Sequence, residues 1–185
     1  MLRLSFFTLV LAALTILAPA LGYAQKQTWL TEENIRAFSK DSEDAYKKPY
    51  EEYLAFIQKT THDQYAATIT TKIMQDGQAS TEMPMTIDKI TLLKSARDAY
   101  DSTKGATLTQ DILSIEIAPD KKTARVTSKI YITNQRIAPG GSMSTILADT
   151  VSTSVDDIVY TPMVGIQVLK SEYENVMTIK QEQEL

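Results

Sequence analysis

The single histidine of the chain, His62, is the first residue to consider for catalysis, because an unperturbed imidazole titrates near neutral pH. It lies in the stretch KTTHDQYAATITTKIMQDGQ, at the foot of a strongly alternating segment. A general base needs a nucleophile or an orienting group within hydrogen-bond reach, whereas the adjacent Asp63 projects to the opposite side of an extended chain. We therefore interpret His62 as a residue at the exit of a helix, where its charge is favourable. We expect no catalytic residue in the chain.

The other chemical motifs are also interpreted structurally. The chain has no cysteine and one histidine, which excludes thiol nucleophiles and leaves a zinc site without its usual ligands. The segment PGGSM at 139–143 lacks the spacing and the lysine of a phosphate-binding loop. Asp156 and Asp157 are adjacent acids without the spacing of a calcium loop, and we interpret them as a turn. We expect neither a metal nor a cofactor.

Aromatic residues give the candidate binding site. Tyr53, Tyr65 and Tyr100 fall on faces that we expect to point inward, together with Ile130. Such residues would line an apolar pocket in which phenolic hydroxyls orient a ligand. The alternative is that the same tyrosines fill the core. A pocket of this composition suits a small apolar or amphipathic molecule.

Capping signals and changes of hydrophobic period predict the elements that would position these residues. Thr31 caps a helix that begins with EENIRAF, with Leu30 and Ile35 as a hydrophobic staple, and Pro49 begins a second helix. The period then changes to two over 65–73. The expected elements that follow are a hairpin turn at 75–78, a weaker edge strand at 79–85, a helix over about 87–101, strands at 107–117 and 123–133, a strand at 144–155 and, after the turn at Asp156–Asp157, a strand at 162–171.

Helices segregated to one face of a curved antiparallel sheet form an α+β roll. Three stretches carry a resemblance to a known family: EENIRAFSKDSEDAYKKPYEEYLAFIQKTTHDQYAATITTKI, MTIDKITLLKSARDAY and ILSIEIAPDKKTARVTSKIYI. Over about residues 30–171 the chain resembles the NTF2-like superfamily, which includes SnoaL-type cyclases and ketosteroid isomerase. The resemblance implies a cone in which a curved antiparallel sheet and about three helices often enclose a cavity.

The resemblance also bears on activity. Members similar to ketosteroid isomerase place an Asp or Glu base inside the cavity. The expected inward positions here hold Ala124, Val126, Ile130 and Ile132, without a carboxylate. We therefore favour a non-enzymatic binding or accessory protein, with a small cyclase or isomerase that uses the cavity as the alternative.

The N-terminus predicts export. Arg3 precedes an apolar run, and Gly22-Tyr23-Ala24 forms a small-residue cleavage site before Gln25. We expect a signal peptide at 1–24 and one domain at 25–185 with a polar C-terminal tail, in the periplasm or secreted. The alternative is an uncleaved anchor, which would favour a structural subunit of a secretion system.

The net charge of the chain limits the classes of partner that we expect. The net charge of −4 gives no electrostatic surface for nucleic acid or anionic lipid. We expect a small apolar ligand or a protein partner, no membrane contact after cleavage, and a homodimer as one use of the sheet face.

Overall fold

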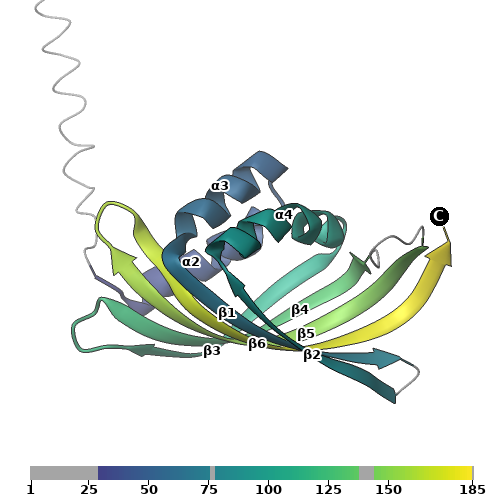
Figure 1. Ribbon diagram of the computed structural model, residues 1–185. Helices are drawn as coiled ribbons and strands as arrows, with labels where there is room; N and C mark the ends of the chain where they lie inside the picture. The colour runs from purple at the N-terminus through teal and green to yellow at the C-terminus, as the bar shows by residue number, and fades with distance from the viewer. Residues whose placement is uncertain (1–28, 76–77, 138–143, 185) are drawn as a thin grey trace, which may run out of the picture.

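The computed structural model describes residues 29–75, 78–137 and 144–184, so the expected signal peptide and the segment PGGSM lie outside the described residues. Three helices lie against the concave face of one curved, six-stranded sheet with the strand order β2-β1-β6-β5-β4-β3 (Figure 1). In chain order the elements are α2 (Glu32–Ala45), α3 (Tyr50–Thr60), β1 (Thr61–Gln75), β2 (Gln78–Asp88), α4 (Lys89–Thr103), β3 (Thr107–Ile117), β4 (Thr123–Ile137), β5 (Ser144–Thr161) and β6 (Gly165–Glu184). The expected α+β cone is confirmed.

Local signals explain where the helices begin. The Thr31 hydroxyl accepts a hydrogen bond from the Asn34 N–H, and the Asn34 side chain accepts one from the Thr31 N–H, which completes a capping box. Leu30 and Ile35, the expected staple, are both buried in one core cluster. Pro49 is the N-cap of α3, one position before the helix that we expected it to begin.

The sheet is mixed, whereas we expected an antiparallel one. The pair β1·β6 is parallel, with Ala67 opposite Ser171, and the other described pairs are antiparallel. Each of the three hairpins from β3 to β6 reverses the chain direction. β6 then lies beside β1 and parallel to it. β2, which contains Pro84, lies at the sheet edge as expected.

The last two strands are longer than the sequence predicted. Asp156 and Asp157 do not form a turn, because β5 continues through them and turns only after Thr161, where the Val164 N–H donates to the Thr161 carbonyl oxygen at 3.2 Å. β6 likewise extends to Glu184, since the backbone of its last residues pairs with the start of β5 from Ser144. The polar C-terminal tail is therefore strand as far as Glu184.

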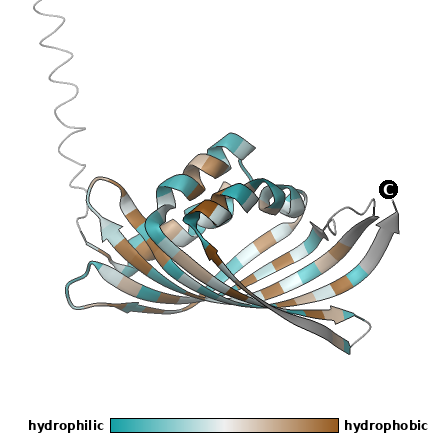
Figure 2. Cartoon of the chain, in the orientation of Figure 1, coloured by the Kyte–Doolittle hydropathy of each residue, from teal (hydrophilic) through white to brown (hydrophobic). Residues whose placement is uncertain are grey.

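Apolar clusters hold the helices on the sheet and against one another. One joins Leu30 and Ile35 to Val126 and Ile158 of the sheet. A second centres on Tyr53 and lies among the three helices, and a third centres on Tyr65, Ala67 and Ile87 of the β1–β2 side. Hydropathic colouring shows the hydrophobic residues alternating along the strands (Figure 2). Within the described part of the chain, no helix has the length and apolarity needed to cross a membrane.

Candidate functional site

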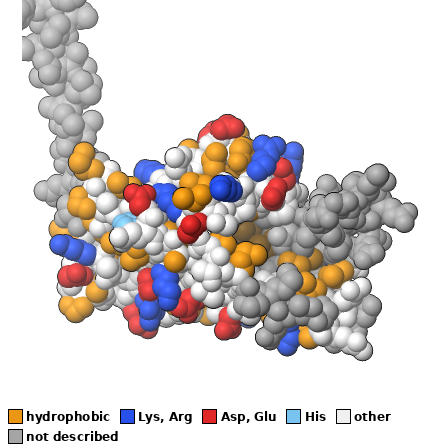
Figure 3. All heavy atoms as spheres, in the orientation of Figure 1, with side chains coloured by type: hydrophobic (Ala, Val, Ile, Leu, Met, Phe, Trp, Pro, Cys, Tyr) orange, Lys and Arg blue, Asp and Glu red, His pale blue; other side chains and the backbone are white. Residues whose placement is uncertain are grey.

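A cavity of about 530 Å³ lies between the inner faces of the helices and the concave face of the sheet. Its walls are mostly apolar and include Phe38, Phe56, Ile69, Ile130 and Met177. No lysine, arginine or histidine is among its lining residues in the described part of the chain. Charged side chains of both signs are instead interspersed over the face of the molecule that Figure 3 shows. The cavity therefore suits an apolar molecule without an anionic group.

Small side chains on β4 and β5 leave this space open. Ser128, Thr150, Ser152 and Ser154 face inward and are at most 6% exposed. The alternating serines and threonines of β5 therefore occupy the inward face of this strand. The side chains are small enough that the curved sheet and the helices do not meet across the centre of the cone.

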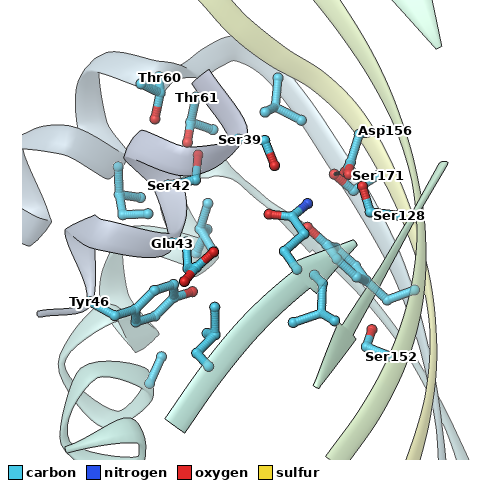
Figure 4. Close-up of a pocket in the computed structure, with 18 of the residues that line it drawn as sticks. Ser39, Ser42, Glu43, Tyr46, Thr60, Thr61, Ser128, Ser152, Asp156 and Ser171 are labelled. Atoms are coloured by element: carbon cyan, nitrogen blue, oxygen red, sulfur yellow. Dashed lines mark hydrogen bonds between the residues drawn. The ribbon is translucent and has the colours of Figure 1, made fainter. Parts of the chain in front are cut away.

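Asp156 lies on the same inward face of β5 and provides a carboxyl group in the cavity (Figure 4). Its Oδ1 accepts a hydrogen bond from the Ser171 hydroxyl at 2.5 Å, and its Oδ2 accepts one from the Ser154 hydroxyl at 3.1 Å. Burial raises the pKa of the Asp156 carboxyl, and the two serine hydrogen bonds act in the opposite direction. The neutral form is therefore favoured more than for an exposed aspartate.

Two tyrosines border this carboxyl group. Burial raises the pKa of Tyr65 and raises that of Tyr173 well above its usual value, and in both cases the charge of Asp156 adds to the effect. These phenols stay protonated and can donate hydrogen bonds. The polar end of the cavity therefore offers neutral donor and acceptor groups.

The structure brings together three of the four predicted ligand-binding residues. Tyr53, Tyr65 and Ile130 line the cavity. Tyr100 is absent from its lining, because its ring packs against Tyr53 at 5.4 Å between centroids and its hydroxyl donates to the Lys48 carbonyl oxygen at 2.9 Å. Tyr100 therefore packs against a residue of the cavity wall, Tyr53, without lining the cavity itself.

His62 lies outside the cavity lining. It directly follows Thr61, the C-cap of α3, and is half-buried as the second residue of β1. Its Nδ1 accepts a hydrogen bond from the Gln64 N–H at 3.1 Å, while Asp63 pairs with Lys89 at 2.8 Å. This histidine and the Asp156 carboxyl group do not form one site.

Asp156 is the site residue that the sequence analysis missed. The inward positions assigned from the sequence lie on β4, and the early end assigned to the preceding strand removed Asp156 from consideration. A signal was nevertheless present, because Ser152, Ser154, Asp156 and Ile158 continue a single period of two. Extending that period would have placed a carboxyl group inside the cone.

The order of two helices, a hairpin, a third helix and a four-stranded meander, folded around a cavity, is that of the NTF2-like fold. No family model matches the chain, and no curated protein matches its sequence.

Many solved structures show similarity to this chain, including the three that follow. A conserved protein from Planctomyces limnophilus is 11% identical, with 79% of this chain and 94% of that chain covered and a TM-score of 0.48. An NTF2-like protein from Cytophaga hutchinsonii is 12% identical, with coverages of 78% and 98% and a TM-score of 0.47. A ketosteroid isomerase-like protein from Erwinia carotovora atroseptica is 12% identical, with coverages of 82% and 97% and a TM-score of 0.45. At these identities and scores no function is carried from one chain to another.

Proposed function

We propose that this protein binds a small, neutral, largely apolar molecule in the cavity between its helices and its sheet. The observation that carries the proposal is the cavity of about 530 Å³, whose walls are apolar and whose described lining contains no basic residue. An apolar cavity left unfilled lowers stability, because its lining atoms lack contacts. A bound apolar molecule restores those contacts.

A neutral fluorophore, N-phenyl-naphthylamine, provides the test. We expect its emission to rise on addition of the protein, and we expect Ile130→Trp, which projects a larger side chain into the cavity, to abolish most of the rise. Tyr131→Trp, at the next position of β4 and on the opposite face of the sheet, is the matched control. Ile132→Trp, also in the cavity lining, serves as a second variant if the first does not fold. Equal emission with the Ile130 and Tyr131 variants would contradict the proposal.

Asp156 supports a second candidate function, an acid–base enzyme that acts on a ligand in the same cavity. A buried carboxyl group with a raised pKa beside an apolar cavity has the properties of a proton-transfer residue. For this candidate, the protein would accelerate deuterium exchange at the carbon next to the carbonyl group of tetralone, and Asp156→Asn would abolish the acceleration. Binding without any accelerated exchange favours the non-enzymatic function.

We also propose that the protein is exported, on the basis of the sequence of residues 1–25. Mass spectrometry of the protein from its native host should give a chain that starts at Gln25. A chain that retains Met1 in the membrane fraction would instead support the anchored alternative.

A further inference from the structure

Four serines and one aspartate form a polar floor on three adjacent strands of the concave face. We call Ser128, Ser152, Ser154, Asp156 and Ser171 the serine floor. Ser128 and Ser154 are direct partners across β4 and β5, and Asp156 and Ser171 are direct partners across β5 and β6. Figure 4 shows Ser128, Ser152, Asp156 and Ser171 on the sheet side of the pocket, across from the helix residues. The strand register therefore brings these side chains together.

The hydrogen bonds within the serine floor divide it into two parts. Each oxygen of Asp156 accepts a hydrogen bond from one serine, Ser171 or Ser154. The Ser128 and Ser152 hydroxyl oxygens, by contrast, are buried without a hydrogen-bond partner among the described residues. Ser128 is 0% exposed and Ser152 is 6% exposed, and both line the cavity. A buried hydroxyl without a partner is unfavourable, so these two groups have capacity for a partner that enters the cavity.

We propose that Ser128 and Ser152 form a subsite that binds a neutral hydroxyl or carbonyl group of the ligand, while Asp156 positions the neighbouring serines. This inference rests on the proposed function, because it assigns the polar group of the molecule that the cavity binds. Ser128 and Ser152 are diagonal neighbours, since Ser152 pairs with Ile130, two residues along β4 from Ser128. Diagonal residues on neighbouring antiparallel strands are in general about 7–8 Å apart. One or two oxygen atoms of a single ligand fit between them.

The chemistry of the lining selects a neutral group. A serine hydroxyl both donates and accepts, so it can bond to a hydroxyl or to a carbonyl oxygen. An anionic group would meet no lysine, arginine or histidine in the described lining. An ammonium group at the serine floor would require ionised Asp156, whereas burial favours the neutral carboxyl. The other carboxyl group of the described lining, Glu43, lies on α2 near Lys47. The apolar walls bind the remainder of the molecule.

Calorimetric titration of the purified protein with three matched compounds tests this inference. The compounds are tetralin, which is a hydrocarbon, tetralol, which adds a hydroxyl group, and aminotetralin, which adds an ammonium group. For the double variant Ser128→Ala/Ser152→Ala, we expect tetralol affinity to fall about 10-fold or more relative to tetralin affinity. The ratio of tetralol affinity to tetralin affinity is compared between the variant and the wild type, so the different hydration of the two compounds cancels. Aminotetralin should bind more weakly than tetralol.

The control is the double variant Thr127→Ala/Thr153→Ala, which changes the neighbouring residues on the opposite face of β4 and β5. We expect this control to keep the wild-type ratio. Tetralin binding with an unchanged ratio in the serine variant would overturn the subsite and leave the proposed function intact. Binding of neither compound to the wild-type protein would overturn the proposed function and the subsite together. Tighter binding of aminotetralin than of tetralol would overturn the neutral assignment.

The serine variant also provides a measurement that does not depend on the ligands. Because the two hydroxyls have no protein partner to lose, we expect its melting temperature to match or exceed that of the wild type. A lower melting temperature would show that these hydroxyls are already bonded within the protein, which would overturn the inference.

Discussion

Asp156 lies in an environment unlike that of an exposed aspartate. Its carboxyl group lies in an apolar cavity and accepts hydrogen bonds from two serines. Burial raises its pKa above the ordinary value for aspartate. The folded protein therefore holds this proton more tightly than the unfolded chain, and the contribution of Asp156 to the free energy of unfolding falls as pH rises above about 4.

Replacement of Asp156 by Asn should remove this pH-dependent loss. We expect the stability of Asp156→Asn relative to the wild type to increase between about pH 4 and pH 7, as measured by urea denaturation at several pH values. Asp157→Asn is the control, because it changes the adjacent residue, whose carboxylate pairs with Arg125 at 2.8 Å on the outer surface. A relative stability of Asp156→Asn that stays flat or falls over this range would contradict a raised pKa.

Ser128 and Ser171 form a matched pair for a second test, because both are 0% exposed and only Ser171 bonds to Asp156. We expect Ser171→Ala to lower the free energy of unfolding by about 1–3 kcal/mol, since an oxygen of Asp156 loses its donor. Ser128→Ala should change it by less than about 0.5 kcal/mol or raise it. Equal losses in the two variants, measured by urea denaturation at pH 7, would contradict the assigned hydrogen bonds.

At the scale of elements, α2 begins where its capping box and staple direct it. Thr31→Ala removes the side-chain acceptor of the Asn34 N–H and should lower the free energy of unfolding by about 1 kcal/mol. Thr103→Ala is the control, because the Thr103 hydroxyl donates to carbonyl oxygens of its own helix, at 3.0 and 3.1 Å. Chemical denaturation of both variants provides the measurement. A larger loss for Thr103→Ala would contradict the role of the cap.

The sequence predicts the elements whose signals are local. The cap at Thr31 and the period of two at 65–73 identified a helix and a strand close to their observed positions. The ends of β5 and β6 could not be identified in the same way, because Asp156–Asp157 and residues 181–184 are polar and lie in strands through pairing with distant segments. Tertiary pairing there overrides local propensity.

The same distinction applies to the site. Tyr53, Tyr65 and Ile130 were placed in the cavity because apolar residues on an inward face follow from periodicity. The serine floor could not be placed in this way, because serine and threonine side chains are mostly exposed in folded proteins and their periodicity does not identify an inward face. Only the register of β4, β5 and β6 brings Ser128, Asp156 and Ser171 to one place.

At the scale of the whole molecule, three helices lie against one curved sheet (Figure 1). A cavity of about 530 Å³ remains between them. A molecule that binds only the folded state raises its stability by mass action. The central claim is therefore that this space holds a small neutral ligand, with apolar walls around its body and the serine floor at its polar group.

A high-resolution crystal structure of the protein purified from its own host tests this claim most directly. We predict electron density for a small molecule in contact with Tyr65 and Ile130, with an oxygen atom within hydrogen-bond distance of the Ser128 or Ser152 hydroxyl. A cone packed by its own side chains, without space for a ligand, would contradict the account.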